Sequence, residues 1–146
     1  MNPAIEEFVK GKRIAVLGVS RTGKKFGNTI FDELKKRGYQ PVIVHPEAQE
    51  INGTRCYHSL GDLNGQLDGV LICLPPHQTV QALRDTAASG ISKIWIQQGA
   101  DSPEVKAVAS ELRLTPITGK CILMYAQPVT GFHNFHRAFA KLFGQY

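Results

Sequence analysis

Residues 13–28 read RIAVLGVSRTGKKFGN, and this stretch decides the fold class. Its first part is a near-continuous apolar run over residues 14–17, and a segment with three glycines follows. Strands of a parallel sheet that is covered on both faces have this unbroken apolar character. The stretch therefore predicts a strand, a glycine-rich turn and the start of a helix, in that order.

The same alternation of apolar runs and amphipathic segments continues along the chain. Strands are predicted at residues 13–18, 41–45, 68–74, 93–97 and 115–118, and helices at 27–37, at 78–89 and from Ser102-Pro103 onward. Residues 46–67 hold an Asn52-Gly53 turn signal and at most a short helix near Leu60–Leu63. This order predicts a Rossmann-like α/β fold: a doubly wound, mainly parallel five-stranded sheet with helices on both faces.

Length and composition indicate one globular domain over residues 1–146. Hydrophobic residues make up 42% and charged residues 20% of the chain, which disfavours a disordered protein. A separate full catalytic domain has no room at this length. The three cysteines, without a CxxC spacing or a signal-peptide pattern before them, favour a cytoplasmic protein.

The last segment, residues 130–143, is predicted to form an amphipathic helix with a wide aromatic face. Phe132, Phe135, Phe139 and Phe143 lie on that face. So much apolar surface is expected to be covered, either by this chain or by a second copy. A homodimer is the preferred reading.

The glycine-rich turn is a candidate phosphate site. Glycines allow the backbone to approach a ligand closely, and free N–H groups at a helix start attract phosphate oxygens. Ser20 adds a hydroxyl, and nine basic residues against two acids lie between Lys10 and Arg37, which favours an anionic ligand nearby. The alternative is a tight turn with ordinary solvated lysines.

The spacing of the turn excludes two common nucleotide motifs. The glycines do not follow G-x-G-x-x-G, and Lys25 stands where a P-loop has its Ser or Thr metal ligand. His45 ends the second strand, where NAD-specific enzymes place an acid for the ribose. An NAD(P)-linked oxidoreductase on the same fold remains an alternative. Nucleic-acid binding through the basic residues is a weaker one, because no reading motif accompanies them.

Several short motifs, in this order, give the chain a family resemblance over about residues 8–124. They are Gly18-x-Ser20 with Lys25-x-Gly27-Asn28, Gly38-Tyr39 before Val44-x-Pro46, Glu50-Ile51-x-Gly53, Tyr57-x-Ser59-Leu60, Asp68 before the run Leu71 to Pro75, Trp95-x-Gln97-x-Gly99 and Gly119-x-Cys121. With these motifs the chain resembles the small CoA-binding proteins. Their single domain is similar to the amino-terminal CoA-binding domain of the succinyl-CoA synthetase alpha subunit.

The resemblance implies that CoA or an acyl-CoA lies across the carboxyl ends of the strands. Val19, Ser20 and Arg21 would hold the diphosphate, and His45 and Pro46 would border the adenosine. The full set of implied ligand-binding residues is Gly18, Val19, Ser20, Arg21, Lys25, Gly27, Asn28, His45, Pro46, Leu74, Pro75, Pro76, Gln97, Gln98 and Gly99. The phosphorylated histidine of the synthetase belongs to another domain, so the resemblance carries over binding only.

No catalytic or metal-binding group is predicted. His77 follows the Pro75-Pro76 pair but has no evident nucleophile as partner. His133 and His136 lie three residues apart without two further ligands nearby. Cys73 reads as an inert core thiol, and a mixed disulfide between Cys121 and CoA stays open.

Overall fold

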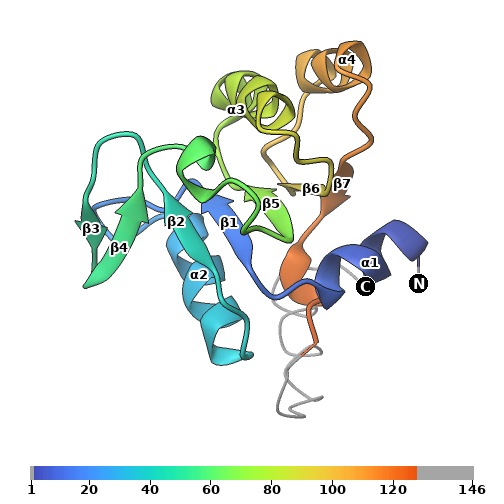
Figure 1. The fold of residues 1–146 in the computed structure, drawn as a ribbon. Helices are drawn as coiled ribbons and strands as arrows, with labels where there is room; N and C mark the ends of the chain where they lie inside the picture. The colour runs from blue at the N-terminus through green and yellow to red at the C-terminus, as the bar shows by residue number, and fades with distance from the viewer. Residues whose placement is uncertain (1, 128–146) are drawn as a thin grey trace.

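A seven-stranded sheet forms the centre of the computed structural model, which describes residues 2–127 (Figure 1). The strand order is β3-β4-β2-β1-β5-β6-β7, and every pairing is parallel except that of β3 with β4. The strands are β1 (Ile14–Leu17), β2 (Val42–Val44), β3 (Glu50–Ile51), β4 (Thr54–Tyr57), β5 (Gly69–Ile72), β6 (Ile94–Gln97) and β7 (Ile117–Lys120). The expected Rossmann-like α/β class is confirmed.

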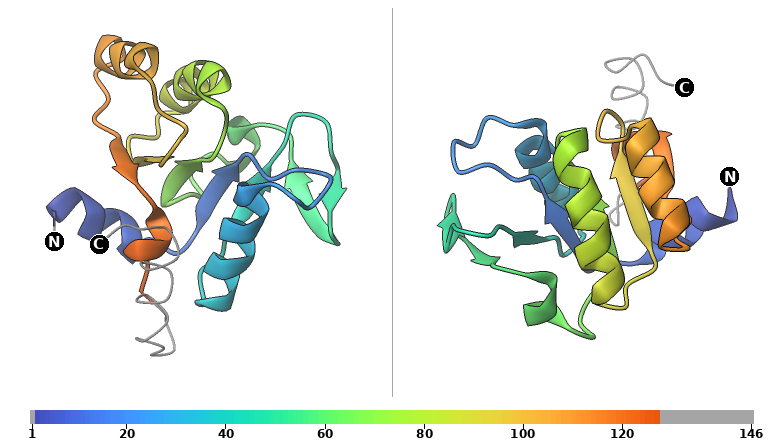
Figure 2. Two further views of the ribbon diagram at one scale, coloured as in Figure 1. Left: turned by 180° about the vertical axis from the view of Figure 1, so that it is seen from behind. Right: turned by 90° about the horizontal axis from the view of Figure 1, so that it is seen from above.

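Helices cover both faces of the sheet, as expected (Figure 2). Those described are α1 (Pro3–Lys10), α2 (Phe26–Lys36), α3 (Pro76–Ala88) and α4 (Pro103–Glu111), with 3₁₀ turns η1 (Leu60–Leu63) and η2 (Ile122–Met124). Helices α3 and α4 lie on one face, whereas α2 and η2 lie on the other. The described part of the chain contains no helix long and apolar enough to cross a membrane.

The core consists of two apolar layers, one on each face of the sheet. Successive residues of β1 point to opposite faces, as in any strand. Ile14 and Val16 therefore join the layer under α2, and Ala15 and Leu17 join the layer under α3 and α4. Trp95 of β6 is fully buried, and its indole N–H donates to the Lys120 carbonyl at 2.9 Å.

The sheet has two strands more than the five predicted. Strands β3 and β4 form a hairpin inside residues 46–67, a stretch that was expected to contain little regular structure. Its turn is Asn52-Gly53, and both residues have positive φ (50° and 79°), as a type I′ hairpin turn requires. These strands are only two and four residues long and are partly exposed, so no apolar run marks them.

Helix α1 was also not predicted. Asn2 caps it, because its side chain accepts a hydrogen bond from the Ala4 N–H at 2.8 Å. Ile5 and Phe8 bury one side of the helix, and Phe8 meets the Trp95 ring edge-on at a centroid distance of 5.4 Å. The predicted helix over residues 130–143 lies outside the described residues.

Candidate functional site: a cavity at the carboxyl edge of the sheet

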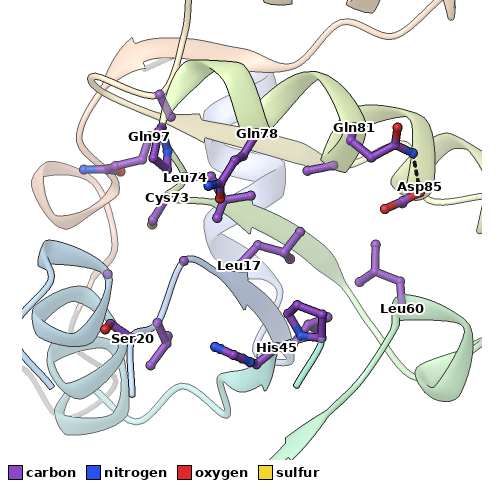
Figure 3. A pocket seen from close by; sticks show the side chains of 18 of the residues that line it. Leu17, Ser20, His45, Leu60, Cys73, Leu74, Gln78, Gln81, Asp85 and Gln97 are labelled. Atoms are coloured by element: carbon purple, nitrogen blue, oxygen red, sulfur yellow. Dashed lines mark hydrogen bonds between the residues drawn. The ribbon is translucent and has the colours of Figure 1, made fainter. Parts of the chain in front are cut away.

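A cavity of about 1150 Å³ opens where the parallel strands end (Figure 3). The ends of β1, β2, β5 and β6 border it, and one side of α3 forms its opposite wall. In an open α/β sheet this edge is where ligands bind. Of the fifteen residues that the resemblance implied, all but Asn28 and Pro76 line this one cavity.

Two glycines of the turn are required by the packing of the backbone. Gly18 has a φ of 112°, and a Cβ there would collide with the Cys73 carbonyl at the end of the neighbouring strand. A Cβ on Gly27 would collide with the carbonyl of Gly18 itself. These glycines therefore let α2 start directly against the end of β1, which brings the helix start to the cavity.

Asn28 holds the glycine-rich turn in place from behind. Its side-chain oxygen accepts from the Ser20 N–H at 2.8 Å, and its amide donates to the Ser20 carbonyl at 2.9 Å. The Ser20 peptide N–H is thus engaged within the protein. The Ser20 hydroxyl faces Thr22 Oγ1 at 2.9 Å. Asn28 is therefore a positioning residue of the turn rather than part of the cavity wall.

The basic residues between Lys10 and Arg37 do not all lie at the cavity. Only Arg21 and Lys25 among them line the cavity. Arg37 is buried, pairs with Glu33 at 3.0 Å and donates to two backbone carbonyls near η2. Among the Lys and Arg side chains of the described residues, Arg21 and Lys25 are therefore the two positioned to attract an anion into the cavity.

The turn after β2 is organised by His45. Its Nδ1 accepts hydrogen bonds from the N–H groups of Glu47 (3.1 Å) and Ala48 (2.9 Å). A neutral His45 ring must then carry its hydrogen on Nε2, so it offers a donor there. The same turn carries Glu47, an exposed residue that is part of the cavity lining.

Sequence reasoning missed the wall opposite the strands. Gln81 and Asp85 of α3 line the cavity and share a hydrogen bond of 2.9 Å. His58, Ser59 and Leu60 enter it from the loop after β4. The helical spacing of Gln78, Gln81, Ala82 and Asp85 was the available signal for the α3 wall, since these positions share one helix face. The loop after β4 gave no comparable signal.

Gln97 closes the cavity beneath the end of β6. Its side chain is 2% exposed, and its oxygen accepts from the Ile122 N–H at 3.1 Å. The residue therefore ties β6 to η2 while it contributes to the cavity wall. Gln98 and Gly99 follow it along the rim, and Leu74 and Pro75 border the neighbouring strand exit.

The thiol at the cavity is that of Cys73 rather than Cys121. Cys73 follows β5, is half-buried and lines the cavity, whereas Cys121 is 1% exposed and does not. Burial raises the pKa of the Cys73 thiol far above its usual range, and it also raises the pKa of Cys121. Both thiols thus stay protonated at neutral pH, which makes them poor nucleophiles.

Other candidate groups lie apart from the cavity. His77 is exposed on α3 and does not line it. Within residues 2–127 no group of three His, Cys, Asp or Glu side chains is placed to hold a metal ion. His133 and His136 lie outside the described residues.

This fold and this cavity define a Rossmann-like α/β protein with a ligand site at the carboxyl edge of its sheet. A family comparison matches residues 12–127 to the CoA binding domain. Because the match covers most of the chain, the protein belongs to the CoA-binding domain family.

Relatives of two sizes share this domain. The chain is 28% identical over 145 residues to an ADP-forming acetate–CoA ligase of Archaeoglobus fulgidus, covering 97% of this chain and 22% of the ligase. It is 26% identical over 117 residues to the uncharacterized protein YneT of Bacillus subtilis, covering 80% of this chain and 87% of YneT. The chain thus spans about a fifth of the ligase but most of the small protein.

A solved structure with the same fold comes from Pyrococcus furiosus. It is a conserved hypothetical protein with 31% identity and a TM-score of 0.70, and the match covers 76% of this chain and 96% of that one. This likeness confirms the fold class.

Proposed function

We propose that this protein binds CoA or an acyl-CoA and does not itself transform it. The observation that carries the proposal is the shared cavity: the glycine-rich turn and the ends of β2, β5 and β6 all border it. A ligand that combines phosphates with a long, partly apolar arm suits such a site. The family to which the chain belongs supports the same choice.

In this proposal CoA crosses the carboxyl edge of the sheet. Its diphosphate lies at Val19, Ser20 and Arg21, near the start of α2, where backbone dipoles and the Arg21 charge favour anions. The adenosine lies beside His45 and Pro46. The pantetheine arm then runs past the apolar wall of Leu74 and Pro75 toward the rim formed by Gln97, Gln98 and Gly99.

The groups that line the cavity do not favour chemical conversion of a bound CoA. Cys73 is held protonated by burial. His58 and Ser59 are neighbours in sequence, and no hydrogen bond joins their side chains among the described residues. A paired nucleophile and base, as covalent catalysis requires, is therefore not found in the described wall.

One observation favours a second candidate function. Glu47 is part of the cavity lining two residues beyond His45, close to where NAD-linked enzymes place an acid for the ribose. An NAD(P)-linked oxidoreductase is therefore retained as the competing proposal. Nucleic-acid binding stays the weaker alternative, because one of the basic residues, Arg37, is buried against Glu33 and no reading motif accompanies the others.

The proposal also includes a cytoplasmic location and a homodimer. The three cysteines are free thiols, as in a reducing compartment. The aromatic residues of segment 130–143 support pairing with a second copy.

The direct test is to identify what the protein carries and whether it turns it over. The protein is purified without added ligand, and native mass spectrometry measures any bound small molecule. Acetyl-CoA is then incubated with the protein, and free thiol is measured over time. We expect a mass matching CoA or an acyl-CoA and no thiol release above the buffer rate. Release that disappears in a cavity variant would contradict the non-catalytic proposal.

A further inference from the structure

The end of the cavity beside β2 differs in charge from the end beside the glycine-rich turn. The two cavity cations, Arg21 and Lys25, both belong to the turn. Beside β2 the cavity has Glu47 instead, together with the ring of His45. A negative group of a ligand at the β2 end would therefore lie near Glu47, and no Lys or Arg among the cavity-lining residues lies at that end.

The position of Glu47 is fixed by its backbone. Its N–H and that of Ala48 both donate to His45 Nδ1, which closes the turn after β2 on the histidine ring. The Glu47 side chain is exposed and lines the cavity. Within residues 2–127 its carboxylate makes no ion pair or hydrogen bond, so both oxygens are open to a ligand.

We propose that Glu47 is a specificity-determining residue, which binds a ribose hydroxyl of the nucleotide and disfavours a phosphate on that ribose. The inference rests on the proposed function, because it assumes that a nucleotide lies across the strand ends. A carboxylate accepts hydrogen bonds from two neighbouring hydroxyls, as acids at the end of a second strand do. A 3′-phosphate in place of one hydroxyl removes that donor and adds a like charge.

The two cations of the turn do not compensate for this effect. In the proposed placement the ligand's diphosphate, with two negative charges, lies at the turn that holds Arg21 and Lys25. The same placement puts the adenosine ribose, and therefore its 3′-phosphate, at the β2 end. The site therefore suits dephospho-CoA at least as well as CoA, although CoA carries more charge.

Titration calorimetry at low salt measures the dissociation constants of CoA and dephospho-CoA with the full chain. We expect the wild type to bind dephospho-CoA at least as tightly as CoA. Glu47→Gln should shift the ratio of affinities toward CoA about threefold to tenfold, and Glu47→Lys about tenfold or more. Glu50→Gln is the matched control, since Glu50 is exposed on β3 outside the cavity. It should leave the ratio unchanged.

The outcomes separate this inference from the proposed function. A wild type that binds CoA more tightly than dephospho-CoA would overturn the role of Glu47 and leave CoA binding in place. Ratios that stay constant in both Glu47 variants would do the same. Failure of both ligands to bind at millimolar concentration would overturn the proposed function and the inference together. Circular dichroism of each variant checks that the fold is retained.

Discussion

Asn28 governs the shape of the phosphate turn without lining the cavity. It satisfies both the N–H and the carbonyl of Ser20, and it is only 5% exposed. A sequence motif alone cannot distinguish such a positioning residue from a ligand contact, because both roles favour the same residue at the same spacing. Gly18 is a similar case. Glycine is needed there because a Cβ would collide with the carbonyl of Cys73, whether or not a ligand is bound.

Asn28→Ala should destabilise the protein and weaken CoA binding together. Two hydrogen bonds are lost, each worth about 1 kcal/mol, so unfolding should become easier by about 2 kcal/mol. Urea unfolding followed by circular dichroism measures the change. Thr29→Ala, at the exposed next position of α2, is the control. Wild-type stability in Asn28→Ala would show that the turn does not depend on this side chain.

Arg21→Ala should weaken CoA binding about tenfold to a hundredfold, because one charge-assisted hydrogen bond is worth about 1.5–3 kcal/mol. The dependence of affinity on salt should become flatter, since one charge fewer meets the phosphates. Calorimetry at two salt concentrations measures both effects. Lys35→Ala is the control, because Lys35 is exposed near the other end of α2. Equal losses in the two variants would indicate a general charge effect instead of a contact.

The cysteines should react slowly in the folded protein. Burial raises the pKa values of Cys56, Cys73 and Cys121, so less thiolate is present at a given pH than in the unfolded chain. At pH 8 we expect iodoacetamide to modify the native protein much more slowly than the urea-unfolded protein, and CoA to protect Cys73 further. Mass spectrometry of the peptides identifies the modified sites. Rapid native modification of Cys73 would mean that its thiol is ionised.

Among the elements, the strands with buried apolar runs were the most predictable. The five predicted strands correspond to β1, β2, β5, β6 and β7. The runs of β1, β5 and β6 are buried throughout, whereas β7 is partly exposed and ends in Gly119-Lys120. The hairpin of β3 and β4 gains its order from pairing with β2, a contact that no local pattern reveals. Likewise, residues of the cavity at strand ends could be inferred from motifs, whereas the α3 wall and Glu47 depend on how the elements pack.

The buried Arg37, at the C-terminal end of α2, links this helix to the η2 segment through hydrogen bonds to backbone carbonyls. Arg37 pairs with Glu33 and donates to the carbonyls of Leu123 and Ala126 at 2.8 and 2.6 Å. Removing one partner leaves a buried charge, so Arg37→Leu should cost about 3–5 kcal/mol of stability. Thermal unfolding compares this variant with Lys36→Leu, at an exposed neighbouring position. A loss no larger than that of the control would show that the pair is not important for stability.

For the molecule as a whole, the sequence predicts an oligomeric state, the homodimer, which can be tested in solution. The four phenylalanines of segment 130–143, which lies outside the described residues, are predicted from the sequence to share one large apolar helix face. We expect the full chain to be a homodimer in light scattering. A chain truncated at Thr130 should be monomeric or poorly soluble. A monomer in both cases would contradict the dimer.

CoA and NAD differ in the part of the ligand that would occupy the wall beyond the glycine-rich turn. Both ligands carry a diphosphate for the glycine-rich turn, but only CoA has a pantetheine arm for the wall formed by Leu74, Pro75 and the end of β6. Titration calorimetry with the full chain should therefore give a clearly lower dissociation constant for CoA than for NAD. Equal affinities for CoA and NAD, or no binding of CoA at millimolar concentration, would contradict the proposal that this protein binds CoA.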